Sequence, residues 1–173
     1  MKTSPFLYLL CLALLLPIMS CGQSGEKEES AGSDEVVAEG LTPEELAEAI
    51  MATYREAVGD IVTLTEGLPD GQSIYDDAVS MKEQYVQKFV AYGKQKEAMS
   101  DADRSAIDRK LRLGMSSFYR DQAYKAYMEA TNSYMSTHRE LQKILADFNV
   151  ITQYADFELL RKQLPEEAKR FGV

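Results

Sequence analysis

The sequence from residue 41 to residue 173 predicts an all-α fold, a helical bundle of three long helices with a shorter helix at the C-terminal end. Apolar residues recur at every third or fourth position over long stretches, which places them on one face of a helix. The strand-like run Asn149–Thr152 is short and lies in a connection. We therefore expect one domain over 41–173, in which packed helices enclose a single core.

The first expected helix begins at Pro43, after residues that are typical of a helix start. Thr42 can cap the helix, Pro43 suits its first position, and Glu45 completes a capping box. Its apolar face consists of Leu46, Ile50, Tyr54, Val58, Ile61 and Val62. The run 67–71, Gly-Leu-Pro-Asp-Gly, is expected to end the helix in a turn.

The second expected helix starts near Ser73. Its apolar face consists of Ile74, Ala78, Met81, Tyr85, Phe89 and Tyr92. That face is widened by Val79, Val86 and Val90. A face this wide is expected for a helix that packs against two neighbours. Gly93 and the polar run 94–98 are expected to fray or end the helix.

The third apolar stretch runs from residue 102 to residue 148 after a cap at Ser100, and no proline interrupts it. A single helix over this stretch would be about 70 Å long, roughly twice the length of the first two. It must therefore extend past its partners or break. The expected break points are Gly114 with Ser116–Ser117, and then 131–133, which are poor helix formers. The early apolar spacing is closer to an eleven-residue repeat than to heptads, so we expect no continuous left-handed coiled coil.

Composition marks both ends of the domain. The segment from Gly22 to Gly40 is rich in Gly, Ser and Glu, which predicts a disordered acidic tether before the first helix. At the other end, a short helix is expected from Tyr154 to Leu164, with Pro165 ending it.

The first residues have the organisation of a secretion signal. Lys2 supplies a positive start, and Phe6–Leu16 is an apolar stretch of about the length of a signal-peptide core, too short to span a membrane. The run Ile18–Cys21 resembles the lipobox of bacterial lipoproteins. This resemblance implies that residues 1–20 are removed as a signal peptide and that Cys21 is lipidated on its sulfur and on the new N-terminus.

Lipidation at Cys21 implies firm attachment to a bacterial membrane, because two or more acyl chains anchor a protein stably. Gly22 follows the cysteine, and the absence of an aspartate there favours the outer membrane, facing the periplasm or the cell surface. The mature chain would keep one cysteine, already occupied by lipid, so no disulfide is expected within it.

The chain is acidic, with 28 Asp and Glu residues against 19 Lys and Arg residues and a formal net charge of −9. Such a charge argues against a general nucleic-acid-binding protein. The expected contacts are therefore the membrane, through the lipid, and a protein partner in the envelope.

The sequence predicts a non-enzymatic protein without a cofactor. His138 is its only histidine, which excludes most metal enzymes, because a zinc site needs about three or four protein ligands. Two alternatives stay open. An acidic chain always offers carboxylate pairs, so a carboxylate-based envelope hydrolase is one of them. The other is a carrier or sensor that binds a small apolar ligand or haem between helices, with His138 and Met51 or Met81 as axial haem ligands.

A group of arginines on the third stretch is one candidate binding surface. This basic strip consists of Arg109, Arg112 and Arg120. One interpretation is a solvated face with local ion pairs, Asp108–Arg112 and Asp121–Lys125. The other is a docking strip for an acidic partner or for lipid phosphates.

Tyrosines on the same stretch are the second candidate surface. Tyr119, Tyr124 and Tyr127 combine an apolar body with a polar tip, which suits the rim of a small bundle and also an interface or sugar-binding groove. Together with the lipobox, these surfaces predict a lipid-anchored adaptor or assembly accessory that binds a partner through the basic strip and the tyrosines.

Overall fold

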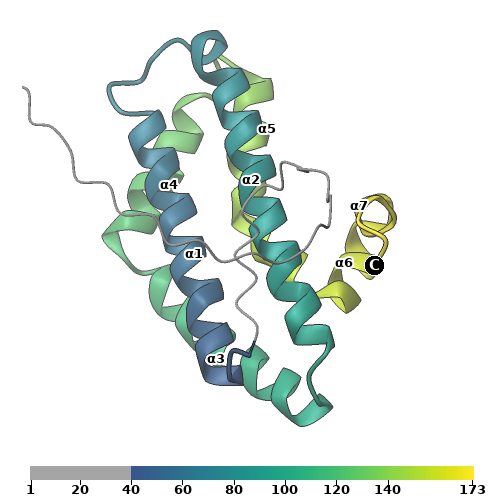
Figure 1. Cartoon of the computed structure of the whole chain (residues 1–173). Helices are drawn as coiled ribbons and strands as arrows, with labels where there is room; N and C mark the ends of the chain where they lie inside the picture. Colours follow the sequence, from purple (N-terminus) through teal and green to yellow (C-terminus); the bar gives the residue numbers. More distant parts are fainter. Residues whose placement is uncertain (1–39) are drawn as a thin grey trace, which may run out of the picture. The chain divides into compact units, whose positions relative to one another are not determined.

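The computed structural model describes residues 40–173, which form a bundle of helices (Figure 1). The helices are α1 (Pro43–Leu64), α2 (Gly71–Glu97), α3 (Asp101–Phe118), α4 (Gln122–Ser133), α5 (Arg139–Ala146), the 3-10 helix η1 (Asp147–Ala155), α6 (Phe157–Gln163) and α7 (Pro165–Arg170). No strand occurs within these residues, so the predicted all-α fold class is confirmed. The expected signal peptide, Cys21 and nearly all of the expected tether lie outside the described residues.

Helix α1 lies at the centre of the bundle, where it packs against α2, α3, α4 and η1. Its start is the predicted capping box: the Thr42 hydroxyl accepts the Glu45 N–H at 3.3 Å, and the Glu45 carboxylate accepts the Thr42 N–H at 2.8 Å. These hydrogen bonds hold the pKa of Glu45 below its usual value. The helix ends in the expected turn, where Gly67 and Leu68 both have positive φ.

Helix α2 does not end at Gly93, as the sequence suggested, but continues to Glu97. Gly93 is buried because η1 and α6 press against this point of the helix. A Cβ atom there would lie 2.4 Å from Cε1 of Phe157 and 2.9 Å from the carbonyl oxygen of Tyr154. The glycine therefore serves a close contact between segments, and the helix runs through it.

The third apolar stretch breaks twice, close to both expected break points. Helix α3 ends at Phe118, whose ring packs edge-on against Tyr54 with centroids 5.4 Å apart. Asp121 then caps α4 by accepting the N–H of Gln122 at 3.0 Å. The second break follows Ser133, and His138 caps α5. Because of these breaks, the stretch packs first on α1 and then on α2 instead of extending past its partners.

The C-terminal part begins with η1, which holds the run 149–152 and packs against α2 and α1. The last predicted helix starts later than expected, since α6 begins at Phe157 after the cap Asp156. Pro165 separates α6 from α7, as expected, and also provides the first residue of α7. Within residues 40–173, no helix combines the length and hydropathy that a membrane crossing needs.

Candidate functional site

Two surface grooves lie on either side of η1. We name the first the α3–α6 groove; it lies between α3 and the η1–α6 segment and has a volume of about 880 Å³. The second, the α2–α7 groove, lies between α2, η1 and α7 and has a volume of about 730 Å³. Val150 and Gln153 of η1 line both grooves. The first groove contains three of the six residues that the sequence singled out as candidate partner-binding residues.

The α3–α6 groove has an apolar lining that is open to solvent. Its apolar side chains are Leu111, Met115, Tyr119, Val150, Ala155 and Leu159. Three of them are among the exposed large apolar residues of the described part: Tyr119 at 44 %, Val150 at 50 % and Leu159 at 37 %. Grouped apolar side chains on a surface are typical of an interaction site, whereas scattered ones are ordinary.

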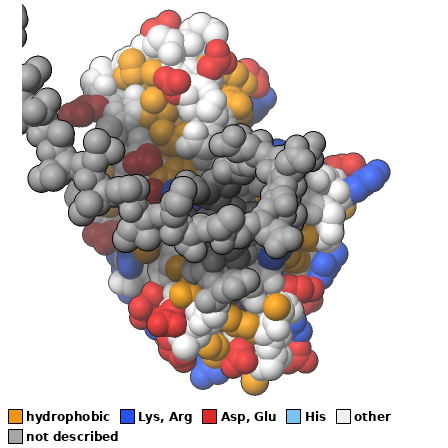
Figure 2. All heavy atoms as spheres, viewed as in Figure 1, with side chains coloured by type: hydrophobic (Ala, Val, Ile, Leu, Met, Phe, Trp, Pro, Cys, Tyr) orange, Lys and Arg blue, Asp and Glu red, His pale blue; other side chains and the backbone are white. Residues whose placement is uncertain are grey.

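The basic strip is divided by this groove. Arg112 and Arg120 line the groove together with Tyr119, whereas Arg109 lies on α3 outside the lining. On the face shown in Figure 2, carboxylates and basic side chains are interspersed. Arg112 and Arg120 form no ion pair with any carboxylate of residues 40–173, and the same holds for Arg109 and several other basic residues of this range.

The local ion pairs that would have neutralised the strip are not formed. Asp108 lies four residues before Arg112, but its carboxylate accepts from Lys96 at 2.6 Å. Asp121 caps α4, and the ion pairs of residues 40–173 do not include one between Asp121 and Lys125. The two local ion pairs are therefore absent, while Arg109, Arg112 and Arg120 are all exposed to solvent.

Lys96 is a residue of this site that the sequence reasoning missed. It is 5 % exposed, and its ammonium lies between Asp108, at 2.6 Å, and Asp156, at 2.9 Å, so it joins α2, α3 and the cap of α6 at one end of the groove. Burial raises the pKa of Asp156, but the Leu159 N–H and the Lys96 ammonium outweigh it and hold the pKa below its usual value. Its spacing could have identified it as a buried residue, because Lys96 lies seven residues after Phe89 and three after Gly93, on the buried face of α2.

The three candidate tyrosines occupy different environments. Their rings form a chain, with centroids 4.8 Å apart for Tyr119 and Tyr124 and 5.7 Å apart for Tyr124 and Tyr127. Tyr124 is half-buried, its hydroxyl donates to Oδ1 of Asn149 at 2.7 Å, and burial raises its pKa. Tyr127 is 0 % exposed and donates to the Leu145 carbonyl oxygen at 2.8 Å. Tyr127 therefore belongs to the core and is not accessible to a partner, and Tyr119 alone of the three faces the groove.

His138 has a structural role in α5. The Nδ1 atom of His138 accepts the N–H of Leu141 at 3.1 Å. The His138 side chain also packs against Gly71 at the start of α2, where a Cβ atom added to Gly71 would lie 2.6 Å from the Cβ of His138. Met81 lies ten residues further along α2 than Gly71, about 15 Å at 1.5 Å per residue. Met51 lies on α1, beside Gly114 of α3. These positions do not fit a haem held between His138 and either methionine.

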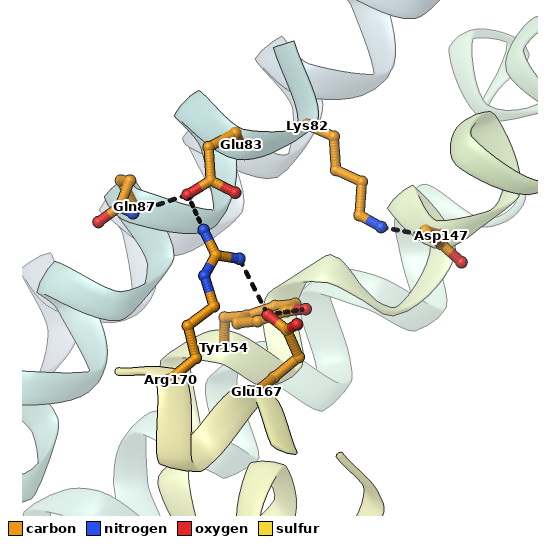
Figure 3. Close-up of polar contacts among 7 residues, drawn as sticks. All are labelled: Lys82, Glu83, Gln87, Asp147, Tyr154, Glu167 and Arg170. Atoms are coloured by element: carbon orange, nitrogen blue, oxygen red, sulfur yellow. Dashed lines mark hydrogen bonds and ion pairs between the residues drawn. The ribbon is translucent and has the colours of Figure 1, made fainter. Parts of the chain in front are cut away.

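The α2–α7 groove has charged side chains that pair with one another (Figure 3). Lys82 of α2 pairs with Asp147 of η1, and Arg170 of α7 lies between Glu83, on α2, and Glu167. Burial raises the pKa of Glu83, but the hydrogen bonds from Gln87 and Arg170 lower it below its usual value. The charged side chains of the α2–α7 groove are therefore paired with one another within the domain.

The α3–α6 groove joins an exposed apolar floor to two exposed arginines. An open apolar floor with two arginines beside it can hold an amphipathic ligand and orient its negative charges. Among residues 40–173, no group of three His, Cys, Asp or Glu side chains is placed to hold a metal ion. Comparison of the chain with protein-family models, with curated proteins and with solved structures found no match.

Proposed function

We propose that the protein is a lipid-anchored protein of the bacterial envelope whose helical domain acts as a non-enzymatic adaptor, holding a partner protein at the membrane. The observation that carries this proposal is the α3–α6 groove, with its exposed apolar floor and two arginines that no described carboxylate neutralises. Tyrosine and arginine around an apolar centre are typical of protein–protein interfaces.

The membrane half of the proposal depends on the N-terminal sequence. The run Ile18–Cys21 resembles a lipobox, and Gly22 after the cysteine favours the outer membrane, facing the periplasm or the cell surface. Replacing Cys21 by Ser should move the protein from the membrane fraction to the soluble fraction. Membrane residence of the Cys21→Ser variant would contradict the lipid anchor and leave the groove unaffected.

Photo-crosslinking in the native host tests the adaptor half. A photoreactive phenylalanine analogue at Tyr119 should capture a reproducible protein partner, because Tyr119 lies in the groove. The matched control is the same analogue at Leu113, which is 70 % exposed on the same helix but outside the groove lining. A partner captured equally from both positions, or from neither, would contradict the groove as the docking surface.

The size of the α3–α6 groove favours a second candidate, a carrier of a small amphipathic ligand. Its volume of about 880 Å³ is within the range of small-molecule sites. Native mass spectrometry of the protein purified from its host distinguishes the two candidates. A stoichiometric small molecule that is lost in an Arg112→Glu/Arg120→Glu variant would favour the carrier, and an unliganded mass would favour the adaptor.

A further inference from the structure

We infer that the partner of the α3–α6 groove is an amphipathic helix with an apolar inner face and a carboxylate at each end of that face. This inference rests on the proposed adaptor function and names the chemistry of what the groove binds. It follows from the length of the groove, the position of its two arginines and the charge of the rest of the chain.

The length of the apolar floor matches about two turns of a helix. Leu111, Met115 and Tyr119 are four residues apart along α3 and its C-terminal cap, so the floor extends for about 12 Å. Val150 and Leu159 form the opposite side. A helix presents side chains at i, i+3, i+4 and i+7 on one face, which fits a floor of this length between two walls.

The two arginines determine where negative charge must lie on that helix. Arg112 is near the start of the apolar floor, and Arg120 lies in the turn after α3, one residue past the end of the floor; eight residues separate them, about 12 Å at the helical rise. Acidic residues seven positions apart on a helix are separated by about 10.5 Å, within reach of two flexible arginine side chains. The partner should therefore carry Asp or Glu at i and i+7, with apolar residues at i+3 and i+4.

Charge also decides between a helix and an anionic membrane surface. Three basic and two acidic side chains line the groove, Lys96, Arg112 and Arg120 against Asp108 and Asp156, whereas the whole chain carries a formal charge of −9. An acidic helix can bring its carboxylates to Arg112 and Arg120 beside the apolar floor while it contacts little of the acidic remainder of the chain. A flat anionic bilayer would face the acidic remainder of the chain and could not enter the groove.

The test is a binding titration of the purified full-length protein with a labelled designed peptide, followed by fluorescence anisotropy. The peptide has about 18 residues, enough for partial helicity, with Glu at i and i+7 and Leu at i+3 and i+4. A matched peptide has Lys at both Glu positions. We expect the acidic peptide to bind and the basic peptide to bind at least about tenfold more weakly.

Variants of the protein localise the effect. The Arg112→Glu/Arg120→Glu variant should lose at least about tenfold in affinity for the acidic peptide and gain affinity for the basic one. The gain also shows that the variant is folded. Arg109→Glu is the control, because it makes one such Arg→Glu change on α3 outside the groove, and its affinity should change by less than about twofold.

Each other outcome contradicts the inference. If Tyr119 captures a partner in cells but the acidic peptide does not bind, the helix is the wrong occupant and the adaptor proposal stands. If neither occurs, both fail. Groove-dependent binding of lipid-free Cys21→Ser protein to phosphatidylglycerol vesicles would assign the arginines to a membrane surface, and self-association that Arg112→Glu/Arg120→Glu abolishes would assign them to a second copy of the chain.

Discussion

The two grooves beside η1 share Val150 and Gln153 but differ in how they use charge. In the α2–α7 groove, Lys82 pairs with Asp147, and Arg170 links α7 to Glu83 of α2 (Figure 3). In the α3–α6 groove, Arg112 and Arg120 pair with no carboxylate of the described residues. On one side of η1 the charges hold the C-terminal segment in place; on the other side, we propose that Arg112 and Arg120 bind the charge of a ligand.

The α3–α6 groove nevertheless has one internally paired end. At the end next to α2, the Lys96 ammonium forms ion pairs with Asp108 and Asp156. The end next to Tyr119 has no such ion pair among the described residues. The comparison therefore predicts that substitutions at Lys96 affect stability, whereas substitutions at Arg112 and Arg120 affect binding.

The largest expected effect is that of Lys96→Met. The methionine keeps much of the buried volume but leaves two carboxylates without their cation, so we expect a loss of about 2–3 kcal/mol in the free energy of unfolding, measured by urea denaturation at pH 7. Lys94→Met, at an exposed position of the same helix, should change stability by less than about 0.5 kcal/mol. Equal losses in the two variants would contradict a structural role for the Lys96 ion pairs.

The effect of Lys96→Met should also depend on pH. The folded pKa of Asp156 is lowered, so its contribution to stability is present above the unfolded value of about 3.9 and is lost as the pH falls through the folded pKa. The stability difference between wild type and Lys96→Met should therefore narrow below about pH 4. A difference that stays constant down to pH 2 would contradict this prediction.

The next effect concerns Gly93, where η1 and α6 approach α2. Gly93→Ala should destabilise the protein by about 1–3 kcal/mol, because the new Cβ overlaps Phe157 and the Tyr154 carbonyl oxygen. Gly59→Ala is the matched control in α1, where a Cβ meets nothing within 4 Å, and it should stabilise by about 0.5–1 kcal/mol. Thermal denaturation of both variants should give shifts of opposite sign, and shifts of the same sign would contradict the close contact.

The smallest expected effect is that of Arg170→Glu in the α2–α7 groove. The new carboxylate faces Glu83 and Glu167, both partly exposed, so we expect a loss of about 1 kcal/mol that shrinks in 1 M salt. Urea denaturation at low and high salt measures it. A loss that does not depend on salt would indicate that Arg170 acts through packing on the Phe171 ring instead.

Local chemistry explains what the sequence could predict. Thr42 and Ser100 were identified as caps because their partners lie three residues away. The breaks of the third stretch were placed within a few residues because Gly, Ser, Thr and Asn are poor helix formers. The spacing predicted the basic strip on one helix; Arg109 and Arg112 lie on α3, but Arg120 lies in the turn after it, because α3 ends at Phe118.

Contacts between distant segments explain what the sequence missed. Lys96 was taken as part of a polar helix end, because its partner Asp156 is 60 residues away. Gly93 was read as a stop, since Phe157 and Tyr154 approach it only in the folded bundle. Tyr127 was grouped with Tyr119 by sequence proximity, yet only the packing of α4 on α1 and α5 decides which ring is buried.

The most direct test of the central claim compares the two grooves in one experiment. Arg112→Glu/Arg120→Glu and Arg170→Glu are measured side by side for affinity to the acidic peptide and for free energy of unfolding. We predict that the first variant loses at least about tenfold in affinity with unchanged stability, and that the second loses about 1 kcal/mol of stability with unchanged affinity. Equal loss of affinity in both variants, or in neither, would contradict the assignment of the α3–α6 groove as the binding surface.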